Sequence, residues 1–439
     1  MKEIYKLVRS KLNPGSVLEL SWVFAGQAAT VILSFVIIKI LSGMGPKDYG
    51  IYALVITIAV FIGLSFYGPV AQGFIRFYYY YLEKSLSRIF TGFIFRILII
   101  SSSIFLFLTL VLAFIKSFFI LPEPTMFFLF AGIYIITSKV SEFFNSVLNL
   151  IRKRKENSIL QGMEKSFIII FLVLLMYLKA LILTNVFVIL ASVTLVFAVV
   201  KIIVFNKYLP LEEKRETGFA KSAQSEMRIR MFQYVSPFFI WGFSAWLQLN
   251  GEKWIINGLL STYDVGIYAI MMALVNALVI VPNNIISDFA TPIIFQQYSD
   301  MDNSEKMNTG HHYIRLNMLV IFLLTLFSTI ITYFWGRELI ILISNKSYTV
   351  YWYLLPLLSF GTGMFLTGQA QTVFGLALNQ PKKYLMPKVI IGIFAIMLNI
   401  ILIKYEGING VAITVLLIGV IYFFYIAFVN KKIKHGFST

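Results

Sequence analysis

The sequence predicts an all-α polytopic membrane protein with about twelve transmembrane helices in two six-helix bundles. Hydrophobic residues make up 59% of its 439 residues and charged residues only 13%, which is too apolar for a soluble domain. The apolar residues fall into runs long enough to cross a bilayer, which takes roughly 20 residues. One short motif also occurs twice, about half a chain apart. That spacing is typical of a duplicated helical bundle.

The repeated motif is Asp48-Tyr49-Gly50-Ile51-Tyr52-Ala53, and its second copy, Asp-Val-Gly-Ile-Tyr-Ala, covers 264–269. The motif glycines, Gly50 and Gly266, are 216 positions apart. Each copy lies between two apolar runs, and a proline breaks the run that follows. The glycines suit tight turns or close helix packing. Tyr52 and Tyr268 suit the aromatic belt of a membrane protein. We therefore interpret the motif as architectural.

The apolar runs give the candidate spans in chain order. They are 17–41, 49–70, 90–115, 124–150, 158–178, 181–205, 234–260, 264–292, 313–335, 350–378, 385–403 and 408–429. An even number of spans in each half gives both halves the same membrane orientation, as in parallel repeats. We expect an N-terminal bundle over 1–205, a cytoplasmic linker over 206–233 and a C-terminal bundle over 234–439.

The distribution of lysine and arginine predicts the orientation. One set of span ends carries 25 of these residues and the opposite set carries seven. The positive-inside rule then places both termini in the cytoplasm. It also accounts for the net charge of +17 without a nucleic-acid partner. The first apolar run is too long for a signal-peptide core, so we interpret it as the first membrane helix.

The sequence gives little support for catalysis or for a metal site. The chain has no cysteine, so thiolate ligands and disulfides are excluded. His311 and His312 are adjacent and would face different sides of a helix, with no carboxylate at ligand spacing. The outer loops are short, whereas a membrane polymerase or glycosyltransferase needs room for a site. We expect no metal, no cofactor and no catalytic residue, and the chain is not predicted to be an enzyme.

Ionisable residues inside the spans are the main candidates for function, because charge within hydrocarbon is costly. Arg96 lies about two turns inside the third span, where it could also extend to the cytoplasmic interface. Lys139 and Glu142 lie three positions apart in the fourth span, so they share a helix face. They could form a purely structural pair. Glu252 and Lys253 lie in the outer half of the seventh span.

The eighth span carries several polar residues, namely Asn276, Asn283, Asn284 and Asp288. The three asparagines have the i, i+7, i+8 spacing of one helix face, and Pro282 interrupts the backbone between them. A kinked, polar helix often lines a cavity. Asp288 could instead be a helix-end residue near the cytoplasm. Polar stripes from both halves predict a V-shaped, water-filled inner cavity between the bundles.

Two stretches resemble a known family. They are Leu41-Ser42-x4-Lys47-Asp48-Tyr49-Gly50-Ile51-Tyr52-Ala53, and Asn250-Gly251-Glu252-Lys253-Trp254-Ile255-Ile256 followed by the second motif copy. Both resemble bacterial polysaccharide exporters of the O-antigen flippase type. In that family the seventh span commonly carries an Asp-Arg or Asp-Lys pair before a Val-Gly-x-Tyr motif. Here Glu252 stands in place of the aspartate.

The resemblance implies a flippase in the bacterial cytoplasmic (inner) membrane. It would move an undecaprenyl-diphosphate-linked oligosaccharide between leaflets for O-antigen, capsule or exopolysaccharide synthesis, with membrane lipids and a polysaccharide polymerase as partners. Arg96, Lys139 and Lys253 could neutralise the diphosphate, and Asn276 and Asn283 could bind sugar hydroxyls. The candidates for ion coupling are Glu142, Glu252 and Asp288. An ion-coupled multidrug antiporter with the same two-bundle plan is the alternative.

Overall fold

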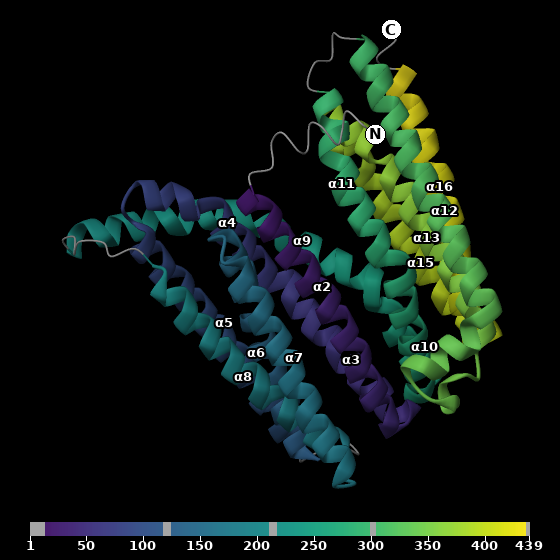
Figure 1. Ribbon diagram of the computed structural model, residues 1–439, viewed down its shortest axis with the longest axis horizontal. Coiled ribbons are helices and arrows are strands. Elements are labelled where there is room, and N and C mark those ends of the chain that lie inside the picture. Colours follow the sequence, from purple (N-terminus) through teal and green to yellow (C-terminus); the bar gives the residue numbers. More distant parts are fainter. Residues whose placement is uncertain (1–13, 117–123, 210–216, 299–303, 436–439) are drawn as a thin grey trace. The chain divides into compact units, whose positions relative to one another are not determined.

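The computed structural model describes residues 14–116, 124–209, 217–298 and 304–435, which are almost entirely helical (Figure 1). Within these ranges, ten helices are long and apolar enough to cross a membrane. The other two predicted spans lie in α9 (Thr217–Leu259) and α13 (Leu355–Gln371), which are helical as well. The predicted all-α polytopic fold is confirmed. The cytoplasmic position of the termini and the V-shaped cavity between the bundles stay predictions, and 1–13 and 436–439 lie outside the described residues.

The chain folds as two compact units. Unit 1 comprises residues 1–44 and 55–246, and unit 2 comprises 45–54 and 247–439. The division therefore falls inside α9 and not in the expected linker, of which 210–216 lie outside the described residues. The rest of that segment, from Thr217 onward, is helix. Its polar residues include glutamine, glutamate, lysine and arginine, which are good helix formers, so polarity alone did not indicate a loop.

Unit 1 is a helical bundle. Its elements are α2 (Pro14–Leu41), η1 (Ser42–Met44), the later turns of α3 (Pro46–Ile62), η2 (Gly63–Tyr67), α4 (Gly68–Glu83), α5 (Ser87–Lys116), α6 (Thr125–Leu150), α7 (Arg154–Tyr177), α8 (Leu183–Lys207) and the first part of α9. Helix α6 packs along α8, and α2 packs along α7. Phenylalanine rings pack between other helices of the unit, and Phe74 on α4 stacks on Phe90 of α5 with ring centroids 5.6 Å apart.

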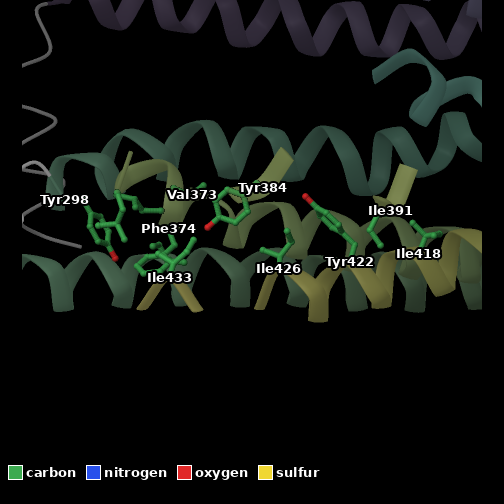
Figure 2. Packing of buried hydrophobic residues seen from close by; sticks show 12 residues of the cluster. Tyr298, Val373, Phe374, Tyr384, Ile391, Ile418, Tyr422, Ile426 and Ile433 are labelled. Carbon is green, nitrogen blue, oxygen red and sulfur yellow. The ribbon is translucent and has the colours of Figure 1, made fainter. Parts of the chain in front are cut away.

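Unit 2 repeats this plan. Its elements are the end of α9, α10 (Thr262–Val275), η3 (Asn276–Ile280), α11 (Val281–Gln297), α12 (Ser304–Ile343), η4 (Lys346–Tyr348), η5 (Trp352–Leu354), α13, α14 (Val373–Ala377), η6 (Pro381–Tyr384), α15 (Leu385–Glu406) and α16 (Asn409–His435). Helix α13 packs against both α12 and α16. Figure 2 shows part of its core, in which Phe374, Tyr384, Tyr422 and Ile426 from several elements belong to one buried cluster that extends along the helices. The tyrosine hydroxyls there are hydrogen-bonded, for example Tyr422 to the amide oxygen of Gln369 at 2.9 Å.

Both copies of the repeat contain a π-helical turn at the same place. Segment η2 joins α3 to α4, segment η3 joins α10 to α11, and a proline follows two residues after each. These prolines are Pro69 and Pro282. Proline has no N–H, and its ring clashes with the carbonyl four residues earlier, so a regular α-turn cannot continue there. The proline breaks noted in the sequence are therefore π turns, which bend a helix without ending it.

The carbonyl released by Pro282 has a replacement donor. That carbonyl belongs to Leu278, and the buried hydroxyl of Ser328 on α12 donates to it at 2.8 Å. Ser328→Ala is expected to leave the oxygen unsatisfied and to lower the free energy of unfolding by about 1–2 kcal/mol. SDS-induced unfolding in detergent micelles measures this change. Ser244→Ala is the control, because Ser244 bonds to Ile240 within its own helix and is exposed. Equal stability of the two variants would contradict this account.

The two motif copies contact each other within unit 2. A Cβ added to Gly50 would overlap the carbonyl of Thr262 and lie 2.9 Å from its carbon. A Cβ added to Gly266 would overlap the carbonyl of Pro46 in the same way, at 2.8 Å from its carbon. Each carbonyl lies four residues before the opposite glycine, so the contact is symmetrical. The glycines therefore allow close helix packing, which was one of the two roles that the sequence left open for them.

Candidate functional site

Unit 1 contains a cavity of about 380 Å³ beside the π turn η2. Residues of α3, η2, α4 and α6 line it, and the charged ones are Lys139 and Glu142. Tyr67 and Ser146 add hydroxyl groups to an otherwise mainly apolar wall. The cavity therefore combines a cation, a carboxylate and hydroxyl groups within an apolar bundle. Such a mixture suits an amphiphilic ligand.

Lys139 and Glu142 form the ion pair that their spacing predicts. The Lys139 ammonium lies 2.8 Å from both carboxylate oxygens of Glu142. The lysine side chain is 9% exposed, whereas that of Glu142 is 60% exposed. The lysine stem crosses Gly63, where an added Cβ would lie 2.9 Å from the lysine Cδ. The π turn and its glycine thus leave space for a buried lysine whose carboxylate partner remains accessible.

A second ion pair in unit 1 was missed by sequence reasoning. Lys201 on α8 is completely buried, and its ammonium lies 2.7 Å from Glu164 on α7 and 2.6 Å from the hydroxyl of Ser141 on α6. Ser141 in turn donates to Glu164 at 3.0 Å. From the sequence alone, Glu164 lies near the start of the fifth span, where an interfacial residue is expected. The signal in the sequence was a lone lysine within the apolar run 183–205, where a charge requires a partner.

Glu252 and Lys253 on α9 bond to different partners. The Tyr268 hydroxyl donates to Glu252 at 2.9 Å, and the Lys253 ammonium donates to the amide oxygen of Asn250 at 3.0 Å. Tyr268 belongs to the second motif copy and is only 1% exposed. The expectation that it lies in an aromatic belt was wrong. Its ring is in the core of unit 2, where its hydroxyl has a carboxylate to bond.

The polar residues of the eighth span do not share one face. Asn283 is buried and accepts a hydrogen bond from Ser287, whereas Asn276, Asn284 and Asp288 are exposed. The predicted stripe assumed a regular helix from Asn276 onward. The π turn η3 covers 276–280, and its wider turn rotates all later residues relative to the earlier ones. The stripe is therefore divided between a buried face and an exposed one.

Arg96 lies on α5 and is exposed. It does not line the cavity that contains Lys139. The structure thus brings together two of the predicted site residues, Lys139 and Glu142. Its described residues contain no cluster of three or more histidine, aspartate or glutamate side chains that could bind a metal ion.

Several solved structures share this fold over nearly the whole chain. A structure of the lipid II flippase MurJ in an inward closed conformation gives a TM-score of 0.66 at 15% identity, covering 95% of this chain and 88% of that one. An inward-facing multidrug resistance MATE family transporter of the MOP superfamily gives a TM-score of 0.64 at 14% identity, covering 92% of this chain and 96% of that one. A mutant of the Vibrio cholerae MATE transporter VcmN gives a TM-score of 0.60 at 12% identity, covering 97% of this chain and 99% of that one.

At 12–15% identity these likenesses show the fold, which the chain shares with MurJ and with MATE family transporters. The family follows from the sequence, because residues 17–298 match the family described as "Polysaccharide biosynthesis protein". The chain therefore belongs to this family, and the resemblance seen in its motifs is confirmed. No curated protein sequence matches the chain.

Proposed function

We propose that this protein is a flippase for an undecaprenyl-diphosphate-linked oligosaccharide. It moves the lipid from the cytoplasmic to the outer leaflet of the bacterial cytoplasmic membrane, for O-antigen, capsule or exopolysaccharide synthesis. The observation that carries the proposal is the buried Lys139 ammonium at a cavity, in a chain of the polysaccharide biosynthesis family. An ammonium in a low-dielectric site interacts strongly with a diphosphate. No catalytic step, metal or cofactor is part of this proposal.

In this proposal the two bundles rock against each other and expose the site to each side in turn. The bundles of this proposal are the halves predicted from the sequence, 1–205 and 234–439, with 206–233 between them on the cytoplasmic side and both termini cytoplasmic. The lipid tail stays among membrane lipids, and a polysaccharide polymerase uses the product. Lys139, Arg96 and Lys253 interact with the diphosphate. Asn276 and Asn283 bind sugar hydroxyls, and the candidates for ion coupling are Glu142, Glu252 and Asp288.

The second candidate is an ion-coupled multidrug antiporter. The likeness in fold to MATE family transporters supports it. An antiporter for cationic drugs requires carboxylates in its binding site, and the accessible Glu142 would suit that role. The buried lysine beside it would repel a cationic drug, but the pair has no net charge, so the family and not the charge of the cavity favours an anionic substrate.

The test reconstitutes the purified protein in liposomes with a labelled undecaprenyl-diphosphate oligosaccharide. A membrane-impermeant reagent then reports which leaflet exposes the sugar. We expect translocation by the wild type, and a rate at least about tenfold lower for Lys139→Ala and Lys253→Ala, because each removes a cation that interacts with the diphosphate. The matched control is Lys207→Ala, which removes an exposed lysine at the end of α8.

The outcomes separate the residues from the function. Translocation that one alanine variant leaves unchanged would remove that lysine from the substrate path. The absence of translocation by the wild type would contradict the flippase, provided that several sugar compositions and both proton and sodium gradients had been applied. Drug efflux driven by an ion gradient in the same liposomes would then support the antiporter.

A further inference from the structure

Five charged side chains alternate in sign across unit 1. Lys139 pairs with Glu142, and Lys201 pairs with Glu164, each at 2.7–2.8 Å. Lys165 on α7 lies close to both pairs, because Ser141, which precedes Glu142, donates at 3.0 Å to Glu164, which precedes Lys165. Both carboxylates also interact with Lys165 electrostatically. The sequence of charges is therefore plus, minus, plus, minus, plus, with three ammonium groups and two carboxylates.

The middle lysine is less well neutralised than the two at the ends. The Lys165 ammonium donates to the hydroxyl of Ser34 on α2, whereas Lys139 and Lys201 each donate to a carboxylate. A hydroxyl is neutral, so it stabilises an ammonium less than a carboxylate does. Lys165 can therefore accept a hydrogen-bonded carboxylate. Glu142 is the one placed to move, because 60% of its side chain is exposed while 15% of that of Glu164 is.

Glu142 also occupies the position that an anionic ligand would need. Both of its oxygens contact the Lys139 ammonium at the edge of the cavity. A diphosphate cannot use that ammonium fully while the carboxylate remains, because the two anions compete for the same donors and repel each other. Binding must therefore either tolerate this repulsion or displace the carboxylate.

We infer that Glu142 is a displaceable counter-ion that occupies Lys139 when the cavity is empty and moves to Lys165 when a diphosphate binds. This inference rests on the proposed function, which supplies the diphosphate. The exchange keeps Lys139 and Lys201 beside an anion in both states and gives Lys165 a carboxylate when the ligand is bound, which limits the cost of an unpaired charge in the bundle. It also aids release, because the returning carboxylate competes with the bound phosphate for Lys139. Lys165 is then a positioning residue that does not touch the ligand.

The test is a double-mutant cycle on ligand affinity. Isothermal calorimetry on the purified full chain uses farnesyl diphosphate for a lipid-borne diphosphate and inorganic pyrophosphate for a free one. We expect Glu142→Gln to bind about tenfold tighter, since the competing anion is lost, and Lys165→Gln to bind several-fold weaker. In the Glu142→Gln background, Lys165→Gln should change the affinity little, because no carboxylate remains to be received.

The cycle distinguishes this role from a direct one. A Lys165 that contacted the phosphate, or acted only through its long-range field, would weaken binding equally in both backgrounds and overturn the inference. Lys165→Arg keeps the cation and should bind like the wild type, which shows that a loss in Lys165→Gln is not misfolding. Glu226→Gln is the matched control, since it removes the carboxylate of an exposed pair with Arg230.

The two probes distinguish the sources of the diphosphate. Tight binding of farnesyl diphosphate with weak binding of pyrophosphate supports exchange by a lipid-borne ligand, and equal binding supports exchange by any diphosphate. Failure of both probes to bind wild type or Glu142→Gln would overturn the inference. The liposome assay separates this failure from that of the proposed function, because a wild type that translocates while the cycle shows no coupling remains a flippase.

Discussion

Gly50→Ala is expected to lower the free energy of unfolding by about 3 kcal/mol. The added Cβ would overlap the carbonyl of Thr262 and lie 3.1 Å from the backbone nitrogen of Gly266. Both obstacles are backbone atoms, so no change of side-chain rotamer can relieve them. The helices α3 and α10 must separate, and all contacts along their crossing are weakened. Unfolding by SDS, followed by circular dichroism and gel mobility, measures the change.

Gly392→Ala is the matched control for this prediction. Gly392 also lies within a helix of unit 2, but an added Cβ would meet nothing within 4 Å. Alanine is a better helix former than glycine by up to about 1 kcal/mol, so this variant should be as stable as the wild type or more stable. A Gly50→Ala variant that matched Gly392→Ala in stability would contradict the close crossing.

The symmetry of the crossing makes a second comparison possible. Gly266→Ala should cost about as much as Gly50→Ala, because its Cβ would overlap the carbonyl of Pro46 in the equivalent way. The double variant should cost less than the sum of the two single variants. Once α3 and α10 have separated to admit one methyl group, part of the space for the other already exists. Additive losses would show that the two glycines act independently.

The fold was largely predictable because hydropathy sets the spans. Every predicted span is helical, since a lipid-facing backbone must satisfy its own hydrogen bonds. The two bundles were also expected from the duplicated motif. The exact division was not, because residues 45–54 cluster with unit 2 through the contact of Gly50 with Gly266. A contact between residues 216 positions apart depends on tertiary packing, which local hydrophobicity does not report.

The candidate site was predictable only where partners are close in sequence. Lys139 and Glu142 lie within one helical turn, so their spacing was enough to predict the pair. The stripe from Asn276 to Asn283 failed because a π turn changed the register between them. Pro282 signalled an interruption, but a proline does not reveal whether the backbone kinks, ends or widens.

Lys201 shows the other limit of reasoning from one sequence. A lysine near the end of an apolar run can extend to the membrane interface, so its residue type alone does not indicate burial. Its partner Glu164 lies 37 positions earlier in another helix. Both residues were visible in the sequence, but only the packing of α6, α7 and α8 makes them a pair.

Lys201→Met is expected to lower the free energy of unfolding strongly, because it breaks this pair on one side. Methionine keeps most of the apolar volume of lysine but removes the ammonium that contacts Glu164 at 2.7 Å and Ser141 at 2.6 Å. The Glu164 carboxylate would remain, 15% exposed, without its cation. Breaking a buried pair on one side costs about 3–5 kcal/mol, because the remaining charge is uncompensated. We expect a loss of that order in SDS-induced unfolding.

The compensating variant tests the cause of that loss. Lys201→Met combined with Glu164→Gln removes both charges, and it should recover most of the stability, since an ion pair replaced by neutral groups of similar volume is often nearly neutral in energy. Lys207 on the same helix is exposed, so Lys207→Met should change the free energy of unfolding by less than about 0.5 kcal/mol. A double variant no more stable than Lys201→Met would show that the lysine contributes through packing. Recovery would instead establish Glu164 as the charge that Lys201 holds between α7 and α8.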